Sequence, residues 1–145
     1  MPDVFTKAER SAVMSRIRGK DTRPERAVRS MLHGMGYRFR LHATNLPGRP
    51  DIVLGKYQTV IFVHGCFWHR HKDCRFAYTP KSRKEFWLNK LKSNVTRDCY
   101  VNTALRKSGW HIFTVWECEL RQLERLARRI DLGLKRRWCA MRGAR

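Results

Sequence analysis

The stretch DIVLGKYQTVIFV, residues 51–63, contains two apolar runs that are separated by a turn. The first run is Ile52 to Leu54, the second is the largely β-branched run from Thr59 to Val63, and Gly55 lies between them. Neither run has a polar side that could face water, which is typical of strands covered on both faces of a sheet. We therefore expect two central strands here.

Helix and strand signals precede this stretch. Thr22 and Glu25 have the spacing of a capping box, and apolar residues then recur on one face of a helix that Gly36 closes. Alternation over residues 37–41 predicts a half-buried strand. A second capping-box pattern predicts an earlier helix from Thr6 to about Ile17.

The same signals continue after the stretch. Ser82 and Glu85 form a third capping-box pattern, which predicts a helix that runs, with a break allowed, to Ser108. A strand is predicted over residues 110–116 and a last amphipathic helix over residues 120–130. The order α, α, β, β, β, α, β, α predicts an α/β fold with a central mixed β-sheet flanked by helices.

The length of 145 residues allows one domain, expected over residues 1–145. Within it we expect an N-terminal helical arm over about residues 1–20 and a loose basic tail over about residues 135–145.

The charge of the chain points to a polyanionic partner. Thirty-two Lys and Arg against 12 Asp and Glu give a net charge of +20. A membrane surface would also attract this charge, but no apolar run approaches the roughly 20 residues of a membrane span. The chain also starts without the residue order of a signal peptide. We therefore expect a cytoplasmic, nucleoid-associated protein that does not bind membranes.

Cysteine and histidine residues gather in one short segment. An odd number of cysteines, five, argues against a disulfide framework. Four of the Cys and His side chains form an accepted structural zinc set, namely Cys66, His71, Cys74 and Cys118. Because a full protein ligand set leaves no position for water, such a zinc is structural. The alternative is a few buried thiols beside surface histidines. We expect ordinary packing for Cys99 and incidental exposure for Cys139.

Two polar residues stand out as candidates for chemistry. His69 is left over beside the predicted zinc loop, and an imidazole with an ordinary pKa of about 6.5 suits a general acid or base. Asp51 opens an apolar strand, where its carboxylate could hold Mg²⁺. An ion pair with one of the many arginines explains Asp51 equally well.

Other residues have simpler explanations beside a functional one. The capping-box position already explains Glu25, and His64 fits a satisfied core histidine. Aromatic residues usually pack in a core, but adjacent rings in a ligand loop of a basic protein can also wedge between base pairs. The aromatic residues concerned are Phe67, Trp68, Phe86 and Trp87.

Four segments together resemble the very short patch repair (Vsr) family of DNA mismatch endonucleases. They are LPGRPD (46–51), HGCFWHRH (64–71), FWL (86–88) and the stretch from GW (109–110) to WEC (116–118). The resemblance covers almost the whole chain. It implies a restriction-endonuclease-like α/β fold with a structural zinc and Mg²⁺-dependent nicking of duplex DNA. The nick falls 5′ of the thymine in a T:G mismatch that arises from 5-methylcytosine deamination.

The resemblance also implies roles for individual residues. The Mg²⁺ ligands are the Asp51 carboxylate and the backbone carbonyl of Val63, and His69 is the proton-transfer group. The hydrated metal cluster includes Glu25 and His64. The intercalating aromatics are Phe67, Trp68 and Trp87, and the zinc ligands are Cys66, His71, Cys74 and Cys118. The expected partner is double-stranded DNA with a T:G mismatch, bound by a monomer, with mismatch-repair proteins and a repair polymerase acting afterwards.

Two other functions fit parts of the pattern. A zinc-stabilised module could recognise mismatched DNA without cutting it, but Asp51 and His69 then have no purpose. A restriction endonuclease of the same fold could cut unmodified sites, but the Phe67-Trp68 pair then has no evident use.

Overall fold

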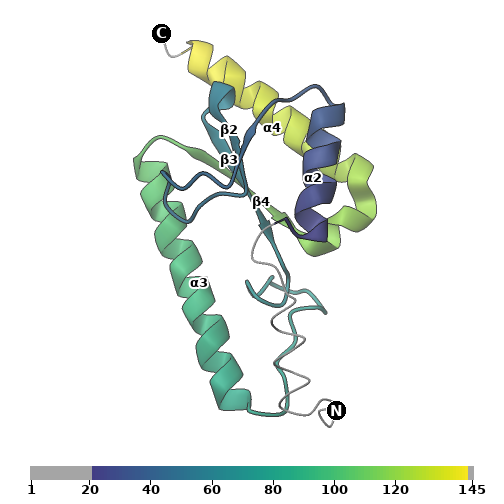
Figure 1. Ribbon diagram of the computed structural model, residues 1–145, viewed down its shortest axis with the longest axis vertical. Helices are drawn as coiled ribbons and strands as arrows, with labels where there is room; N and C mark the ends of the chain where they lie inside the picture. The colour runs from purple at the N-terminus through teal and green to yellow at the C-terminus, as the bar shows by residue number, and fades with distance from the viewer. Residues whose placement is uncertain (1–20, 144–145) are drawn as a thin grey trace.

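The computed structural model of the chain describes residues 21–143. The arm predicted for residues 1–20, with its helix to Ile17, therefore lies outside the described residues. The described elements are labelled as in Figure 1: α2 (Arg23–Gly34), β1 (Arg40–Leu41), β2 (Ile52–Leu54), the 3-10 turn η1 (Gly55–Tyr57), β3 (Thr59–His64), α3 (Lys84–Lys107), β4 (His111–Trp116), the 3-10 turn η2 (Glu117–Gln122) and α4 (Leu123–Gly143).

The strands form one mixed sheet in the order β1-β2-β3-β4. β2 pairs antiparallel with both β1 and β3, whereas β3 and β4 run parallel. The two apolar runs of residues 51–63 are the inner strands β2 and β3, and every residue of β2 is buried. The prediction of a mixed α/β fold with a central sheet is confirmed.

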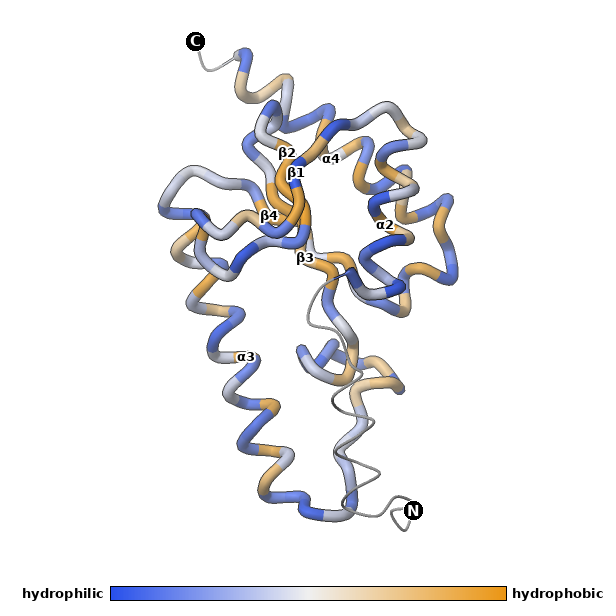
Figure 2. The backbone as a smooth tube through the Cα atoms, in the orientation of Figure 1, coloured by the Kyte–Doolittle hydropathy of each residue, from blue (hydrophilic) through white to orange (hydrophobic). Residues whose placement is uncertain are grey.

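Helices cover both faces of the sheet. In Figure 1, α2 and α4 lie on one side of the strands and α3 lies on the other. Ile52 and Ile61 belong to the core with α2 and α4, whereas Val53 and Val60 pack with residues of α3. Alternate strand residues thus enter opposite cores, which explains why neither run alternates with polar residues. Figure 2 shows the strands as a hydrophobic centre of the tube.

Helix α3, which has 24 residues, contacts the sheet with one end and the loop after β3 with the other. Near its C-terminus, Val101 and Leu105 are buried against the sheet. Its N-terminal half extends beyond the sheet, beside the loop of residues 65–83 that follows β3 (Figure 1). The amide of Asn94 donates a hydrogen bond of 3.1 Å to the carbonyl of Trp68, so the helix and the loop are in contact.

The strand predicted over residues 37–41 is shorter than expected, because only Arg40 and Leu41 pair with β2. Gly36, with φ of +95°, ends α2, and the N–H of Tyr37 then donates to the carbonyl of Leu32 at 3.1 Å. The first residue of the predicted strand therefore caps the helix instead of pairing with a neighbouring strand.

The start of α3 also differs from the prediction. The helix begins at Lys84, its N-cap is Arg83 with φ of 52°, and no side chain caps it, so the capping box of Ser82 and Glu85 is wrong. The Arg83 guanidinium lies over the ring of Phe86, 4.5 Å from its centre. The helix continues unbroken to Lys107.

The loose tail predicted for residues 135–145 is wrong as far as Gly143, because α4 continues to that residue. Arg137 donates to the carbonyls of Tyr57 and Gly109 at 3.2 and 3.0 Å. The ring of Trp138 lies 5.8 Å from that of Tyr57, in an edge-on arrangement. These contacts extend the packed part of the helix from Ile130 to Trp138. No helix within residues 21–143 has the length and apolar character needed to cross a membrane.

Candidate functional site

A cleft of about 920 Å³ opens where β3 ends. Its walls come from the start of α2, the loop before β2, the loop after β3 and the middle of α3. Polar residues that line it include Glu25, His42, Asp51, His64, His69 and Asp98. Residues far apart in the sequence therefore meet in one cavity.

Asp51 lies at the start of β2, beside the main chain of β3. Its Oδ2 accepts a hydrogen bond of 2.7 Å from the N–H of Val63. The register pairs Ile52 with Ile61, so its continuation places Pro50 opposite Val63. A proline has no N–H to donate to the Val63 carbonyl, and this oxygen points to the same side of the strand as the N–H. The two predicted Mg²⁺ ligands therefore adjoin each other.

The environment of Asp51 makes its carboxylate costlier to form than that of an exposed aspartate. Burial raises the pKa of Asp51 to about 6, against the lowering effect of the Val63 N–H, and the Glu25 carboxylate adds to the rise. A carboxylate that is costly to ionise in the folded protein suits a position where a positive charge is bound.

His69 pairs with an acid that sequence patterning did not single out. Its Nδ1 lies 2.7 Å from Oδ2 of Asp98 on α3. The ring of His69 also stacks on that of His64, with 3.8 Å between the centres. Burial, and secondarily the nearby His69, lower the pKa of His64 to about 4. His64 is therefore neutral near pH 7, whereas the Asp98 bond fixes the orientation of His69.

Glu25 is buried, with 3% of its surface exposed. Half of the predicted capping box is present, since the Thr22 hydroxyl accepts from the N–H of Glu25 at 3.4 Å, but the Glu25 carboxylate does not accept from the N–H of Thr22. The Glu25 carboxylate in turn accepts from the N–H of Asp21 at 2.9 Å and from the guanidinium of Arg29 at 3.2 Å. Glu25 thus starts helix α2 and also faces the cleft.

The four predicted zinc ligands meet beside the cleft. Single ligand atoms of Cys66, His71, Cys74 and Cys118 all lie within 4.8 Å of one another. Parallel pairing of His64 with Trp116 brings the residues that follow β3 and β4 together. Sγ of Cys118 lies 3.4 Å from Nδ1 of His71, close to the roughly 3.5 Å between S and N ligands on a tetrahedral zinc. The donor set therefore fits such an ion.

His69 and His71, in the loop after β3, point in different directions. The N–H of His69 donates to the carbonyl of Gly65 at 3.1 Å, and that of His71 donates to the carbonyl of Cys66 at 3.0 Å. Arg70 between them has φ of 54°. As a result His71 reaches the cysteine cluster, whereas His69 reaches Asp98.

Three aromatic rings of the loop and of α3 pack on one another. The ring centres of Phe67 and Trp68 are 5.1 Å apart, and both lie within 5.8 Å of the centre of Trp87. None of the three side chains is buried in either core. The structure thus brings the three predicted intercalating residues together, while Phe86 is 47% exposed at the start of α3.

Sequence reasoning missed Asp98, Arg29 and His42, which all contact residues of the cleft. A signal for Asp98 exists in the helical repeat, because the apolar stripe of α3 contains Leu91 and Val101 with Asn94 and Asp98 between them. Two polar residues on an otherwise buried stripe indicate that something polar lies opposite.

Comparison with known proteins identifies the group to which this arrangement belongs. A sequence model of the family described as "DNA mismatch endonuclease Vsr" matches residues 2–75. The DNA mismatch endonuclease Vsr of Escherichia coli strain K12 is 47% identical over 126 residues, which cover 87% of this chain and 80% of that protein. The chain belongs to the Vsr family. It is a DNA endonuclease.

Two type II nicking enzymes are similarly close to this chain. The type II nicking enzyme V.XorIIP of Xanthomonas oryzae pv. oryzae is 48% identical over 130 residues, covering 90% of this chain and 95% of that protein. The type II nicking enzyme V.NmeAIP of Neisseria meningitidis is 45% identical over 137 residues, covering 90% and 97%.

A solved structure shares the fold of this Vsr family member. The catalytic domain of homing endonuclease I-Bth0305I aligns with a TM-score of 0.55 at 22% identity, over 83% of this chain and 97% of that one. At this identity the likeness concerns the fold alone.

Proposed function

We propose that this chain is a Mg²⁺-dependent mismatch endonuclease that nicks one strand of duplex DNA on the 5′ side of the thymine in a T:G mismatch. Such T:G pairs arise from deamination of 5-methylcytosine, so the nick would initiate very short patch repair. The observation that carries the proposal is the placement of Asp51, beside the Val63 main chain, in the same cleft as the His69–Asp98 pair.

The Asp51 carboxylate and the Val63 carbonyl are the residues that would hold Mg²⁺. Both supply hard oxygen atoms, and Mg²⁺ usually binds one or two protein carboxylates and completes its shell with water and phosphate oxygens. A cation bound there supplies charge that polarises the scissile phosphate and stabilises the leaving oxygen.

The His69–Asp98 pair supports proton transfer. Because Nδ1 of His69 is bonded to Asp98, its Nε2 is left to accept a proton from the attacking water. Asp98 keeps the ring in one orientation and stabilises the positive charge that forms on it. Neutral His64, stacked on the His69 ring, and Glu25 across the cleft would hold water molecules of the hydrated metal cluster.

The three packed rings would recognise the mismatch. Phe67, Trp68 and Trp87 present a rigid, incompletely buried apolar cluster. Unstacking a weakly stacked T:G mismatch costs less free energy than unstacking a Watson–Crick pair. An inserted ring therefore favours the mismatch, because the duplex is easier to deform there. The Asn94 bond to Trp68 keeps the cluster at a defined distance from Asp98 on the same helix.

The predicted zinc would organise this region without taking part in the chemistry. A closed Cys3His ligand set leaves no open position for water. By joining the loop after β3 to the residue after β4, it would hold His69 and the aromatic cluster in place.

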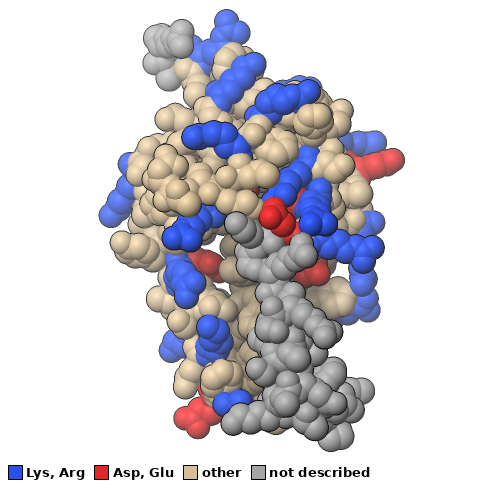
Figure 3. Space-filling model, in the orientation of Figure 1, with Lys and Arg blue, Asp and Glu red and all other residues tan. Residues whose placement is uncertain are grey.

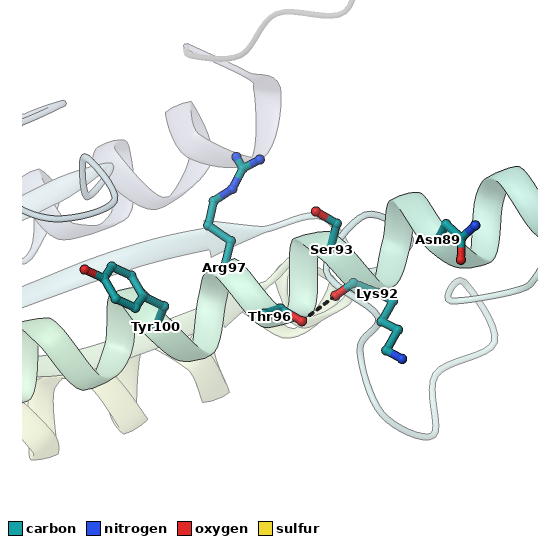
Figure 4. A pocket seen from close by; sticks show the side chains of 6 residues that line it. All are labelled: Asn89, Lys92, Ser93, Thr96, Arg97 and Tyr100. Carbon is teal, nitrogen blue, oxygen red and sulfur yellow. Dashed lines mark hydrogen bonds between the residues drawn. The ribbon is translucent and has the colours of Figure 1, made fainter.

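The surface of the molecule suits the phosphates of a duplex. Figure 3 shows Lys and Arg side chains distributed over the visible face, with few Asp and Glu. Lys92 and Arg97 project from α3 beside the hydroxyls of Ser93 and Thr96 (Figure 4), and Arg97 also lines the cleft. Phosphate oxygens could therefore follow α3 to the cleft.

The experiment that tests this function compares the parent protein and Asp51→Ala on a labelled duplex with one T:G pair and on the same duplex with C:G. The parent should nick only the T:G duplex, only with Mg²⁺, and 5′ of the thymine. Asp51→Ala should lose nicking by orders of magnitude yet bind DNA as well or better, because one negative charge near phosphate is gone. A non-catalytic binding module would bind the T:G duplex and leave it intact in both forms.

A further inference from the structure

A group of basic residues lies away from the cleft, and the proposed function does not use it. The group comes from η1, the last turn of α3 and the last turns of α4. Figure 3 shows Lys and Arg side chains gathered at the upper end of the molecule, where α4 ends in Figure 1. We call this group the basic patch; it consists of Lys56, Arg106, Arg137 and Arg142.

The ring of Trp138 holds two of these cations. Nζ of Lys56 lies over the ring, 5.0 Å from its centre. The guanidinium of Arg142, one turn further along α4, lies over the same ring at 5.7 Å. Because the face of an aromatic ring attracts cations, both side chains are held in place at the surface.

The other two cations lie where α3 turns into β4. Arg137 donates a hydrogen bond of 3.0 Å to the carbonyl of Gly109. Arg106 belongs to the last turn of α3. Burial lowers the pKa of His111, and the charges of Arg137 and Arg106 lower it further. The two arginines are therefore close enough to act on one imidazole.

No acid lies in the segments that form the basic patch. Residues 55–58, 105–111 and 133–143 contain neither Asp nor Glu. They contain three basic residues besides the patch, namely Lys107, Lys135 and Arg136. Like charges repel one another, so holding them together without acids opposes folding. Such a surface suits a polyanion that compensates the charge.

The basic patch and the cleft lie at opposite ends of the parallel strands. Thr59 pairs with His111 where the β3–β4 ladder starts, beside the patch, and His64 pairs with Trp116 where it ends, at the cleft. The six residues of β3 separate these ends by about 17 Å. A short duplex is a stiff rod, so one held in the cleft would have to bend round the sheet to reach the patch.

We propose that the basic patch binds the phosphates of a second DNA duplex while the cleft holds the first. DNA fits better than an acidic protein, because none of the large exposed apolar side chains lies in the three patch segments, whereas protein interfaces bury an apolar centre. Lys and Arg contact phosphates whatever the base sequence. The enzyme can thereby pass from one duplex to another without release. The use of the cleft by the first duplex rests on the proposed function.

A bridging experiment tests the second site. Beads that carry a T:G duplex are loaded with the protein without Mg²⁺, washed, and given a fluorescent C:G duplex. The parent should retain about one fluorescent duplex per protein at low salt. Lys56→Gln, Arg106→Gln and Arg142→Gln combined should retain about tenfold less, because each lost cation removes a phosphate contact. Equal retention by this folded variant overturns the inference.

Two further variants separate the patch from the overall charge. Arg121→Gln, Arg125→Gln and Arg128→Gln combined remove an equal charge from η2 and the first half of α4. Arg128 precedes Trp138 by ten helical residues, about 15 Å, so this variant should bridge like the parent. Exchanging Lys and Arg at the three patch positions keeps the charge and should also preserve bridging. Thermal unfolding and zinc content show whether each variant folds.

Dissociation kinetics test the transfer itself. Release of a labelled T:G duplex from the parent should accelerate in proportion to the concentration of unlabelled C:G duplex, because the competitor binds before the first duplex leaves. The variant with three Gln substitutions in the patch should release its duplex at a rate that does not depend on the competitor. A competitor-independent rate for the parent contradicts the inference.

Other outcomes identify a different use of the patch. If the same Gln variant binds a single short T:G duplex more weakly than the parent, the patch contacts the first duplex and the inference is wrong. Retention of labelled polyglutamate, but not of the C:G duplex, would assign the surface to an acidic protein instead. If the parent bridges two duplexes but does not nick the T:G duplex, the proposed function is wrong and this inference holds.

Chemical modification of the parent decides the matter if the Gln variant does not fold. The exposed amine of Lys56 is acetylated in the presence of one or two equivalents of duplex and analysed by mass spectrometry. The first duplex should leave Lys56 reactive, and the second should protect it. Protection by the first duplex alone, or none by the second, overturns the inference.

Discussion

Asp98 is the residue whose contribution to the chemistry can be tested most directly. Asp98→Asn keeps the size of the side chain but removes the charge beside Nδ1 of His69 that orients the ring. We expect single-turnover nicking of the T:G duplex to fall about 10²-fold or more, since a positioned proton-transfer group contributes at least that much. DNA affinity should change little.

Glu85→Gln is the matched control for Asp98→Asn, because it removes the other acid of α3 at an exposed position. It should nick at the parental rate. If both variants nick equally fast, His69 does not depend on Asp98 for its activity.

The two histidines of the loop provide a second test. His71→Ala should lose zinc, because His71 contacts Cys118, whereas His69→Ala should keep zinc and nick poorly. Elemental analysis of both purified variants, alongside nicking assays, measures the two effects separately. Loss of zinc from His69→Ala with retention in His71→Ala would mean that the ligand and the base have been exchanged.

The packing of α4 on β4 depends on one glycine. A Cβ built at Gly133 would lie 2.1 Å from Cζ of Phe113, and the helix cannot move away without opening the core around Ile130. Gly133→Ala should therefore lower the free energy of unfolding by about 1 to 3 kcal/mol, although a helical alanine is usually the more stable residue. Urea denaturation measures the change.

Two further variants check this explanation. Combining Gly133→Ala with Phe113→Leu frees space and should recover part of the lost stability. Gly34→Ala, in α2 where a Cβ meets nothing within 4 Å, should stabilise the protein by about 0.5 to 1 kcal/mol. Equal effects of Gly133→Ala and Gly34→Ala would rule out the contact with Phe113 as the cause.

Sequence patterning identified the elements whose residues repeat regularly and missed features that depend on distant partners. The runs of β2 and β3 are apolar on both sides, so their place inside the sheet could be predicted. The extension of α4 to Gly143 could not be predicted. In the sequence, Arg137 and Trp138 resemble part of a basic tail, and only the structure shows their contacts with Tyr57.

The sequence likewise predicts some residues of the candidate site and not others. Ligands with short spacings, such as Cys66, His71 and Cys74, stand out in one segment, and the resemblance supplied Glu25 and Trp87. Arg29 and His42 belong to separate elements and meet only because β1 pairs with β2 beside the start of α2. No spacing rule links two such residues, so their contact with Glu25 required the structure.

The net charge of +20 makes DNA binding depend on salt. Each phosphate that the protein neutralises releases counterions, so the logarithm of the binding constant should fall with the logarithm of salt concentration by about 0.9 per contact. Lys92→Ala, which removes one projecting cation of α3, should reduce this slope by about 0.9 on T:G and C:G duplexes alike. Fluorescence anisotropy at several salt concentrations measures it; an unchanged slope would exclude Lys92 as a phosphate contact.

Removal of the proposed zinc should disorder the site before it unfolds the protein. Neither buried core contains a residue of the loop over 65–83, so chelation should abolish nicking while the sheet remains protected from hydrogen exchange. If β2 and β3 instead lose their protection from hydrogen exchange, the whole fold depends on the metal. Cys74→Ala should reproduce the effect of the chelator.

On the proposed ligand set, the parallel pairing of β3 with β4 also determines when the zinc site can form in a growing chain. During synthesis, Cys66, His71 and Cys74 leave the ribosome well before Cys118, which is 47 positions after His71. On the proposed ligand set, the loop cannot close around zinc until β4 has emerged and aligned with β3. By then Asp98 has already been made, so metal capture is the last step that completes the site. An unfinished chain, although already basic enough to associate with DNA, therefore lacks an assembled cutting centre.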